Sequence, residues 1–432
     1  MQPSSGTASL PWRAHFRGLL LWLFTASNGW STAGDPAFSV SVEAGPFDRR
    51  ETTVVVTLPP EAKSGRALRR GRELIPLQVG KDGRAMFRLE ELKKGTTAVY
   101  ELVTDQTKEG QAAITGDTGR VQAQRDGTKL RFTFASESAA NRPAPVALLD
   151  YQMEEELPRP DIRPVLKRGG YLHPVRTLNG LLVTDDYPPN HLHHHGVWGA
   201  WTKTQFQGRE PDFWNMGEGK GRVEFVRLDS SWEGQLHAGL HSTHRFVDLT
   251  TGQPVTALDE RWKVTVFRPA RSYWMFDLES MQTCATPQPL GLPEYHYGGL
   301  GVRGHRAWDG KTRTYFLTSE GESNREKAHA TCARWCDMGG EVEGKRVGLA
   351  ILGHPDNFRA PQPMRVHPTE PFFCFAPQQA GEMSLAPGQV YRSLYRFIVH
   401  DGPPAPAELD RLWNDFASPP AARVVPVKLP AE

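Results

Sequence analysis

The chain has 432 residues, enough for two or three domains. Its 51 basic and 49 acidic residues give a formal net charge of +2, so no global positive field favours nucleic acid as a partner. After the N-terminal region no segment approaches the ~18 consecutive apolar residues of a transmembrane helix, so we expect none in the mature chain.

Residues 1–33 have the order of a secretory signal peptide. Basic residues precede a mostly apolar run, 19–26, and small residues follow at Ser31 and Ala33, where a signal peptidase could cut. We therefore expect a secreted or periplasmic protein. In such a compartment an even number of cysteines permits two disulfides with three possible pairings, or free buried thiols. The four cysteines are Cys284, Cys332, Cys336 and Cys374.

Glycines and prolines spread along the chain and rare helical periodicity predict an all-β protein. We expect a small N-terminal β domain over residues 36–135. Its strands are predicted at 38–43, 52–58, 121–124 and 129–134, with a hairpin turn at Asp126-Gly127 between the last two. The segment 136–146 is rich in Ser, Ala and Pro, which is typical of a linker.

Residues 147–402 are predicted to form the main domain, a large antiparallel β-sandwich. Alternating βα units are missing from the pattern, which argues against a doubly wound fold. The longest strand-like runs are 222–228, 261–267, 274–279, 347–352 and 391–399. Residues 403–432 are predicted as a short helix, 407–416, followed by a proline-rich disordered tail. Leu409, Leu412, Trp413 and Phe416 should share one helix face.

The segment 185–201 carries the clearest sign of function, because four histidines fall within five positions at His191, His193, His194 and His195. Imidazole ligates metals and moves protons near neutral pH. On an extended segment His191, His193 and His195 would share one face, and a His-x-His pair such as His191 and His193 could offer two nitrogens to a divalent metal ion. A catalytic role without metal, or a polar loop with satisfied rings, are the alternatives.

Polar residues flank this cluster and suggest a substrate site. His173 and Arg176 precede Asp186, and an arginine suits recognition of carboxylate, phosphate or hydroxyl groups. The alternative for Arg176 is a structural ion pair with Asp185 or Asp186. Downstream, Trp198 and Trp201 could stack on a sugar ring, or they could belong to the core of the sandwich.

A third block lies at 293–305. If this segment is a strand, Glu294 and His296 project to one face and make a reasonable acid/base pair. The alternative is a buried pair of Glu294 with His296 or Arg303 that stabilises the sheet. His354, at the end of a later apolar strand, is a further candidate, because loop residues often line a site.

Several long motifs resemble one bacterial family. They are Tyr171-Leu-His-Pro, His191-Leu-His-His-His-Gly-Val-Trp, Glu294-Tyr-His-Tyr-Gly-Gly-Leu-Gly-Val-Arg-Gly and Gly348-Leu-Ala-Ile-Leu-Gly-His-Pro-Asp-Asn-Phe-Arg. Over about residues 165–400 the chain resembles the family labelled "methane oxygenase PmoA", which is not the membrane-embedded methane monooxygenase subunit. Many of its members carry another residue, often Arg, at the position of His195, so the resemblance favours His191, His193 and His194. It implies a secreted all-β protein similar to the galactose-mutarotase-like supersandwich, a fold that hosts sugar epimerases, lyases and glycosidases.

These observations lead to three hypotheses. The first is a secreted carbohydrate-active enzyme for a small-molecule or oligosaccharide substrate. In it His193 or His194 acts as acid, and Glu294 or His296 as base. Substrate would be bound by His173, Arg176, Asp186, Trp198, Trp201, Arg303 and His354. The second is a metal-dependent oxidoreductase, as the family label suggests, and the third is a non-catalytic glycan-binding protein of the cell envelope. The enzyme hypothesis requires that the histidines near 193 and the carboxylate of Glu294 face a common hollow.

Overall fold

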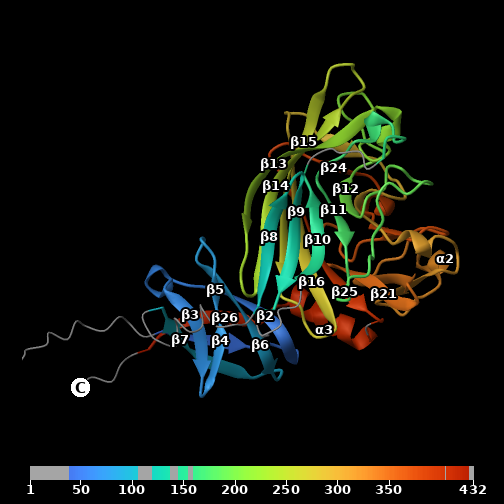
Figure 1. The fold of residues 1–432 in the computed structure, drawn as a ribbon. Helices are drawn as coiled ribbons and strands as arrows, with labels where there is room; N and C mark the ends of the chain where they lie inside the picture. Colours follow the sequence, from blue (N-terminus) through green and yellow to red (C-terminus); the bar gives the residue numbers. More distant parts are fainter. Residues whose placement is uncertain (1–37, 106–118, 137–144, 154–158, 404, 428–432) are drawn as a thin grey trace, which may run out of the picture.

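The computed structural model describes residues 38–105, 119–136, 145–153, 159–403 and 405–427. These residues form a large two-sheet β-sandwich with a smaller β domain at one end (Figure 1). The predicted all-β class with a smaller N-terminal domain is therefore confirmed. The predicted signal peptide, 1–33, and most of the predicted linker, 137–144, lie outside the described residues. Within the described ranges no helix is both long enough and apolar enough to cross a membrane.

The first sheet of the sandwich, here called sheet I, has the strand order β22-β23-β18-β12-β11-β10-β9-β8. Neighbouring strands pair in the antiparallel sense. Its strands are β8 (Arg120–Asp126), β9 (Lys129–Ala135), β10 (Val146–Gln152), β11 (Tyr171–Val175), β12 (Val197–Ala200), β18 (Gly299–Arg303), β22 (Met364–Val366) and β23 (Phe372–Phe375).

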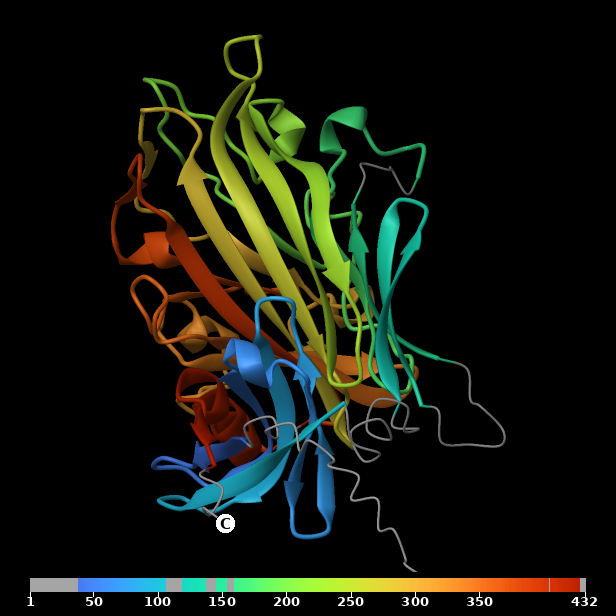
Figure 2. The same ribbon diagram turned by 90° about the vertical axis from the view of Figure 1, so that its left-hand side faces the viewer.

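The second sheet, sheet II, has the order β13-β14-β15-β16-β25-β21-β20-β19. Its long yellow-green strands β13 (Gly221–Trp232), β14 (His237–Asp248), β15 (Val255–Phe267) and β16 (Tyr273–Cys284) run side by side in Figure 2. The other strands of sheet II are β19 (Thr314–Thr318), β20 (Trp335–Val342), β21 (Lys345–Gly353) and β25 (Tyr391–Asp401). A two-stranded sheet, β17 (Leu290–Leu292) with β24 (Met383–Leu385), lies apart, and a short helix α2 spans Arg325–Ala328.

The smaller domain consists of a five-stranded and a three-stranded sheet. Two predictions are corrected here. The hairpin β8–β9 pairs with β10 in sheet I, so the predicted domain boundary at 135 is too late. The predicted disordered tail contains β26, which pairs along the whole of β1. The strands of this domain are β1 (Phe38–Glu43), β2 (Arg49–Thr57), β3 (Gly65–Arg70), β4 (Glu73–Pro76), β5 (Gln78–Val79), β6 (Arg84–Leu92), β7 (Thr97–Thr104) and β26 (Ala421–Pro426).

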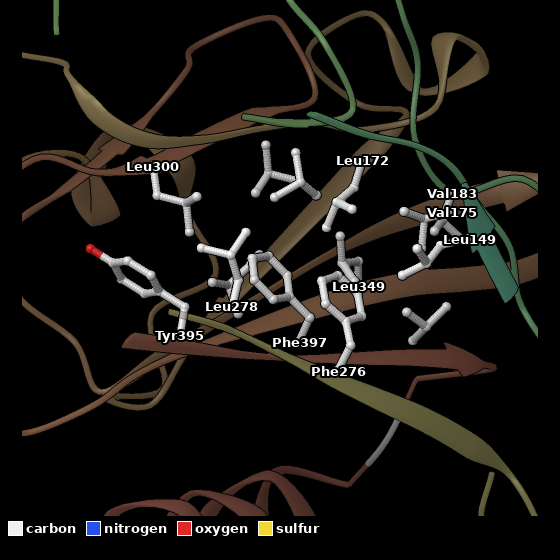
Figure 3. Packing of buried hydrophobic residues seen from close by; sticks show 14 of the residues in the cluster. Leu149, Leu172, Val175, Val183, Phe276, Leu278, Leu300, Leu349, Tyr395 and Phe397 are labelled. Atoms are coloured by element: carbon white, nitrogen blue, oxygen red, sulfur yellow. The ribbon is translucent and has the colours of Figure 1, made fainter. Parts of the chain in front are cut away.

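The main core lies between sheets I and II. Side chains alternate along each strand, so Phe276 and Leu278 of β16 point inward whereas Asp277 between them does not. Figure 3 shows these two side chains opposite Leu172 and Leu149 of sheet I. Burying one such side chain stabilises the fold by about 1.5–3 kcal/mol.

A buried charged network interrupts this core. The carboxylate of Glu260 accepts hydrogen bonds from Ser280 Oγ at 2.6 Å and Gln282 Nε2 at 2.8 Å, and lies 2.9 Å from His244 Nδ1. The nearby guanidinium of Arg168 is buried and donates to the carbonyl of Gly199 at 2.7 Å. Burial lowers the pKa of Arg168 to about 10, against the charge of Glu260, which raises it. Glu260 is thus the counter-charge of a buried cation.

Helix α3 (Pro406–Ala417) lies where the sequence predicts a helix, and it joins the two domains. Its buried residues Leu409, Leu412 and Phe416 pack against the outer face of sheet II. From its far side the carboxylate of Asp415 binds Arg49 of β2 at 2.9 Å, and both side chains are buried. All four cysteines lie in the described part of the chain and are free thiols.

The outer face of sheet I carries several of the candidate residues predicted from the sequence. Val197, Val302 and Phe373 belong to the core between the sheets. By strand alternation their neighbours, Trp198 of β12, Arg303 of β18 and Phe372 of β23, point to the outer side. The histidine-rich segment comes just before β12, and Arg303 ends β18, so the two meet on this face.

Candidate active site on the outer face of sheet I

The histidine cluster lies in turns, not on a strand. The backbone N–H of His191 donates to the carbonyl of Pro188 at 2.9 Å, and that of His194 to the carbonyl of His191 at 2.8 Å. Strand β12 begins only at Val197. The predicted strand alternation among these histidines is therefore wrong. Instead, the ring of His194 is stacked between those of His191, at 4.6 Å, and Phe372, at 4.8 Å.

Burial makes His193 and His194 neutral. The half-buried His193 has its pKa lowered to about 4 by burial, with further lowering by the charges of neighbouring groups. Burial lowers the pKa of the fully enclosed His194 still more strongly. A neutral imidazole accepts a proton and does not supply one. The structure therefore disagrees with the predicted acid role of either histidine and favours His193, the more accessible of the two, as a base.

Asp186 is predicted to bind substrate, but both of its carboxylate oxygens make contacts within the protein. Its Oδ1 lies 2.8 Å from Nδ1 of the buried His195, and its Oδ2 accepts the hydroxyl of Tyr171 at 2.8 Å. Burial would raise the pKa of Asp186, but the hydrogen bond with His195 outweighs it and lowers the pKa. His173, another predicted ligand, is similarly engaged, with Nδ1 2.9 Å from Thr184 Oγ1. These contacts hold the histidine-rich segment on the sheet.

Arg303 is the centre of a polar cluster. Its buried side chain donates through Nη2 to Asp309 Oδ1 at 2.6 Å, to Glu370 Oε2 at 3.1 Å and to Asn190 Oδ1 at 3.3 Å. Asn190 Nδ2 in turn donates to Glu370 at 2.6 Å. The sequence-based alternative, in which Glu294 pairs with Arg303, is wrong. Asp309 and Glu370 take that place.

Asp309 and Glu370 form a carboxyl pair. Burial raises the pKa of Asp309 to about 6, against the lowering charge of Arg303, and the hydrogen bond with Glu370 raises it further. Burial would raise the pKa of Glu370 as well, but the hydrogen bond with Asp309 and the charge of Arg303 lower it. Two carboxyl groups in such contact share one proton over a range in which isolated carboxylates are ionised. The pair can thus supply a proton near neutral pH.

Buried polar atoms without a partner are concentrated at this place. Buried polar groups normally have hydrogen bonds, so each exception calls for an explanation. Among the described residues, those without one at this site are Nε and Nη1 of Arg303, Nδ1 of His191 and His194, Nε2 of His195, and Nε1 of Trp198 and Trp214. This concentration indicates a site whose hydrogen bonds are completed by bound water or a ligand.

The predicted metal site does not have enough ligands. The rings of His191 and His193 are 5.7 Å apart at an interplanar angle of 70°. However, the described residues contain no group of three or more His, Cys, Asp or Glu side chains arranged to hold a metal ion. A protein site for a transition metal needs about three protein ligands. The donor set around His191 and His193 therefore does not fit a resident divalent metal.

Glu294 and His296 do not lie on a strand. Both are exposed on a bent segment before β18, and Glu294 makes no hydrogen bond or ion pair with another described residue. Gln379 Nε2 fixes the bend by donating to the carbonyl of His296 at 2.7 Å. The aromatic contacts between this segment and the histidine cluster pass through Tyr297 and Trp214, whose ring centroids are 5.4 Å apart. The predicted strand over Glu294 and His296 is therefore wrong, and Glu294 has no hydrogen bond or ion pair with the histidine cluster.

The two tryptophans predicted to stack on sugar belong to a core. Trp198 is 0% exposed and Trp201 is 1% exposed, and both pack in an apolar cluster beneath the outer loops. The Nε1 of Trp201 donates to Gln282 at 2.8 Å. Half-buried aromatic rings at the surface come instead from Tyr295 and Tyr297, whose centroids are 5.0 Å apart.

Arg176 and His354 lie away from the cluster. Arg176 donates to the carbonyl of Gly180 at 3.3 Å and lines a pocket of ≈ 410 Å³ with Arg131 and Asp150, so its predicted pairing with Asp185 or Asp186 is not formed. His354 packs against Phe416 of α3 at 4.9 Å, on the opposite side of the sandwich. The prediction that His354 shares the substrate site is wrong.

Asp309 and Glu370 were missed because no sequence motif contains them, whereas Asn190 lies in the segment 185–201 but was not singled out. Asp309 follows a buried tryptophan in a short turn, and Glu370 stands in the proline-flanked segment before β23. One signal was present: His367, three residues before Glu370, is a histidine in a polar loop next to a buried strand. Its ring lies 5.8 Å from that of His191.

Comparison with known proteins gives a family but no activity. The fold has a likeness to a heparan sulfate lyase HepC mutant from Pedobacter heparinus, with 10% identity and a TM-score of 0.30. The likeness covers 66% of this chain and 37% of the lyase, so the chain spans little more than a third of that enzyme. This likeness carries no argument about function. No curated protein matches. A model of a family of unknown function, DUF6807, matches residues 139–414, which is more than half of the chain, and the protein therefore belongs to that family.

Proposed function

We propose that the protein is a carbohydrate-active enzyme that transfers protons at a sugar bound over the outer face of sheet I. The observation that carries the proposal is the carboxyl pair of Asp309 and Glu370, clamped by the buried Arg303. One carboxyl can stay protonated to about pH 6 beside neutral histidines. Enzymes that catalyse proton transfer commonly use an acid and a base whose pKa values differ in this way.

The proposed roles follow from protonation states. His193, neutral above about pH 4, takes a proton from a carbon or hydroxyl of the sugar. Asp309 delivers a proton to the ring oxygen or the departing oxygen. Glu370 positions the acid and tunes its pKa, and Arg303 holds both carboxyl groups in place. Isomerisation, elimination and hydrolysis can all use this pair of groups.

Polar and aromatic groups at the rim support a sugar as substrate. Sugar sites combine a flat ring with hydrogen-bond donors and acceptors. Tyr295 and Tyr297 offer such rings, and Tyr297 OH is held by Asn215 Nδ2 at 3.0 Å. Asn190 supplies an amide beside the carboxyl pair. With the predicted signal peptide, this supports an exported enzyme that acts on glycosides or oligosaccharides.

A screen of glycans and glycosides tests the proposal, with products read by mass spectrometry and mass-neutral isomers by NMR. We expect the wild-type protein to convert at least one compound, and His193→Ala to lower its turnover by about 10²–10⁴-fold. His241→Ala, which removes an exposed histidine of sheet II, is the matched control and should retain turnover. Binding of glycans with no conversion in any reaction would refute the enzyme and favour a glycan-binding protein.

The pH dependence of kcat/KM should be bell-shaped and acidic. The base, His193, must be neutral, so activity rises as pH increases through about 4. The acid, Asp309, must be protonated, so activity falls as pH increases through about 6. Steady-state rates between pH 3 and 9 would measure both limbs, which report the free enzyme. A profile that stays flat from pH 6 to 8 would contradict the assignment of Asp309 as the acid.

Kinship with the family labelled "methane oxygenase PmoA" stays a prediction. The oxidoreductase that this label suggests would need the histidines to converge on one metal ion. As the donor set around His191 and His193 does not supply a third ligand, the geometry favours proton transfer.

A further inference from the structure

Arg365 is a half-buried cation without a counter-charge. It lies in the middle of β22, with its side chain on the outer face of sheet I. Among the described residues its only hydrogen-bond partner is the ring of His329, whose Nε2 is 3.3 Å from Nη1, and no carboxylate pairs with it. A guanidinium has five N–H donors, so most of those of Arg365 stay available.

Three buried arginines of this protein pair with carboxylates. Arg49 binds Asp415 at 2.9 Å, and Arg396 binds Asp277 at 2.7 Å. Arg303 binds two carboxylates. Taking a cation partly out of water is costly unless an anion or hydrogen bonds compensate.

Of the other arginines that lack a carboxylate partner, Arg325 and Arg359 donate to backbone carbonyls and Arg268 packs on the ring of Phe134. Among the described residues Arg365 hydrogen-bonds only to the ring of His329, so its remaining donors are available to an anion that these residues do not provide.

No carboxylate in the described part of the chain contacts Arg365. His296 and His329 lie beside Arg365. The pKa of both rings is lowered, mainly by burial and next by the positive charge of Arg365. The carboxylate of Asp212, whose charge acts on Tyr295, already accepts the backbone N–H groups of Trp214 and Asn215 at 2.9 and 2.8 Å.

The other neighbours suit a sugar. Tyr295 and Tyr297 lie next to the guanidinium, and Lys203 adds a second positive charge 6.0 Å from the ring centroid of Tyr295. A cationic site lined by tyrosine rings suits a ligand that is both a ring and an anion. The two tyrosines come from the bent segment before β18, which Gln378 fixes by donating to the carbonyls of Pro293 at 2.9 Å and Lys203 at 3.0 Å.

We infer that Arg365 binds the anionic group, a carboxylate or a sulfate ester, of an acidic sugar whose ring lies on Tyr295 or Tyr297. The inference rests on the proposed function and names the substrate class of that site. Two residues farther along the chain, His367 contacts His191, with ring centroids 5.8 Å apart. An anion on Arg365 would thus place the sugar beside the proposed acid and base.

Binding of simple glycosides tests this inference without requiring turnover. The probes are methyl glucuronide, methyl glucoside 6-sulfate and neutral methyl glucoside, with dissociation constants from ligand-detected NMR. We expect at least one anionic probe to bind the wild-type protein about tenfold or more tighter than methyl glucoside, since charge-assisted bonds are the stronger ones. Whether the glucuronide or the sulfate is preferred identifies the anionic group.

Variants assign the preference to Arg365. Arg365→Gln should lose it, Arg365→Lys should keep part of it, and Arg392→Gln, which changes an exposed arginine of sheet II, should keep all of it. Asp309→Asn should also keep it, so a failed acid/base mechanism remains distinguishable from a failed anion site. Equal binding of charged and neutral probes, or a preference that survives in Arg365→Gln, would overturn the inference.

Discussion

Replacing Asp309 by asparagine is expected to lower kcat/KM by about 10²–10⁴-fold, the usual contribution of a general acid. Asparagine keeps an oxygen that can accept the hydrogen bond from Arg303, so the fold should be preserved, but it has no proton with a pKa near 6 to deliver. Steady-state kinetics on the best substrate of the glycoside screen measures the effect.

The matched control for this variant is Asp356→Asn. Asp356 has a side chain that is 73% exposed and lies near His354, away from the proposed site. Its replacement should leave kcat/KM unchanged. If Asp309→Asn retained most of the wild-type activity, the proton would have to come from another group, and the carboxyl pair would be a structural ion cluster.

Replacing Glu260 by alanine is expected to destabilise the protein by about 3–5 kcal/mol, because it leaves the buried Arg168 without its counter-charge. The change also removes the acceptor of the hydrogen bonds from Ser280 and Gln282. Urea unfolding followed by tryptophan fluorescence measures the free energy of unfolding.

The control for stability is Glu279→Ala, one position before Ser280 on β16. Glu279 pairs with Arg392, whose side chain is 46% exposed, and an ion pair of this kind contributes about 0–1 kcal/mol. Glu279→Ala should therefore unfold close to the wild-type midpoint. A Glu260→Ala protein as stable as the control would mean that water compensates Arg168 inside the sandwich.

The sequence predicts the fold class well because it depends on local patterns. The alternation of apolar and polar residues along β1, the apolar run in β25, and the helical spacing of Leu409, Leu412 and Phe416 are visible in a single chain. The pairing partners of the strands are not visible in a single chain. The pairing of β8 and β9 with β10, and of β26 with β1 across more than 300 residues, depends on long-range packing that no local pattern contains.

The site is predicted only in part for the same reason. The histidine cluster and Arg303 were found from composition and motif, and they do lie together. Their partners Asp309 and Glu370 come from two separate turns, and only the packing of β18 against β23 brings them to Arg303. The predicted strand through Glu294 failed because the segment bends before β18: Gly298 has φ of 143°, where a Cβ would lie 2.5 Å from Gln378 Oε1.

The central claim is that Asp309 and Glu370 share a proton on the outer face of sheet I, and it can be measured without a substrate. The titration of the Asp309 carboxyl carbon, followed by ¹³C NMR and assigned with Asp309→Asn, should have its midpoint at about pH 6 in the wild-type protein. In Glu370→Gln the midpoint should fall, because the neighbouring negative charge is gone. A wild-type midpoint near the ordinary aspartate value of about 3.9 would contradict the account.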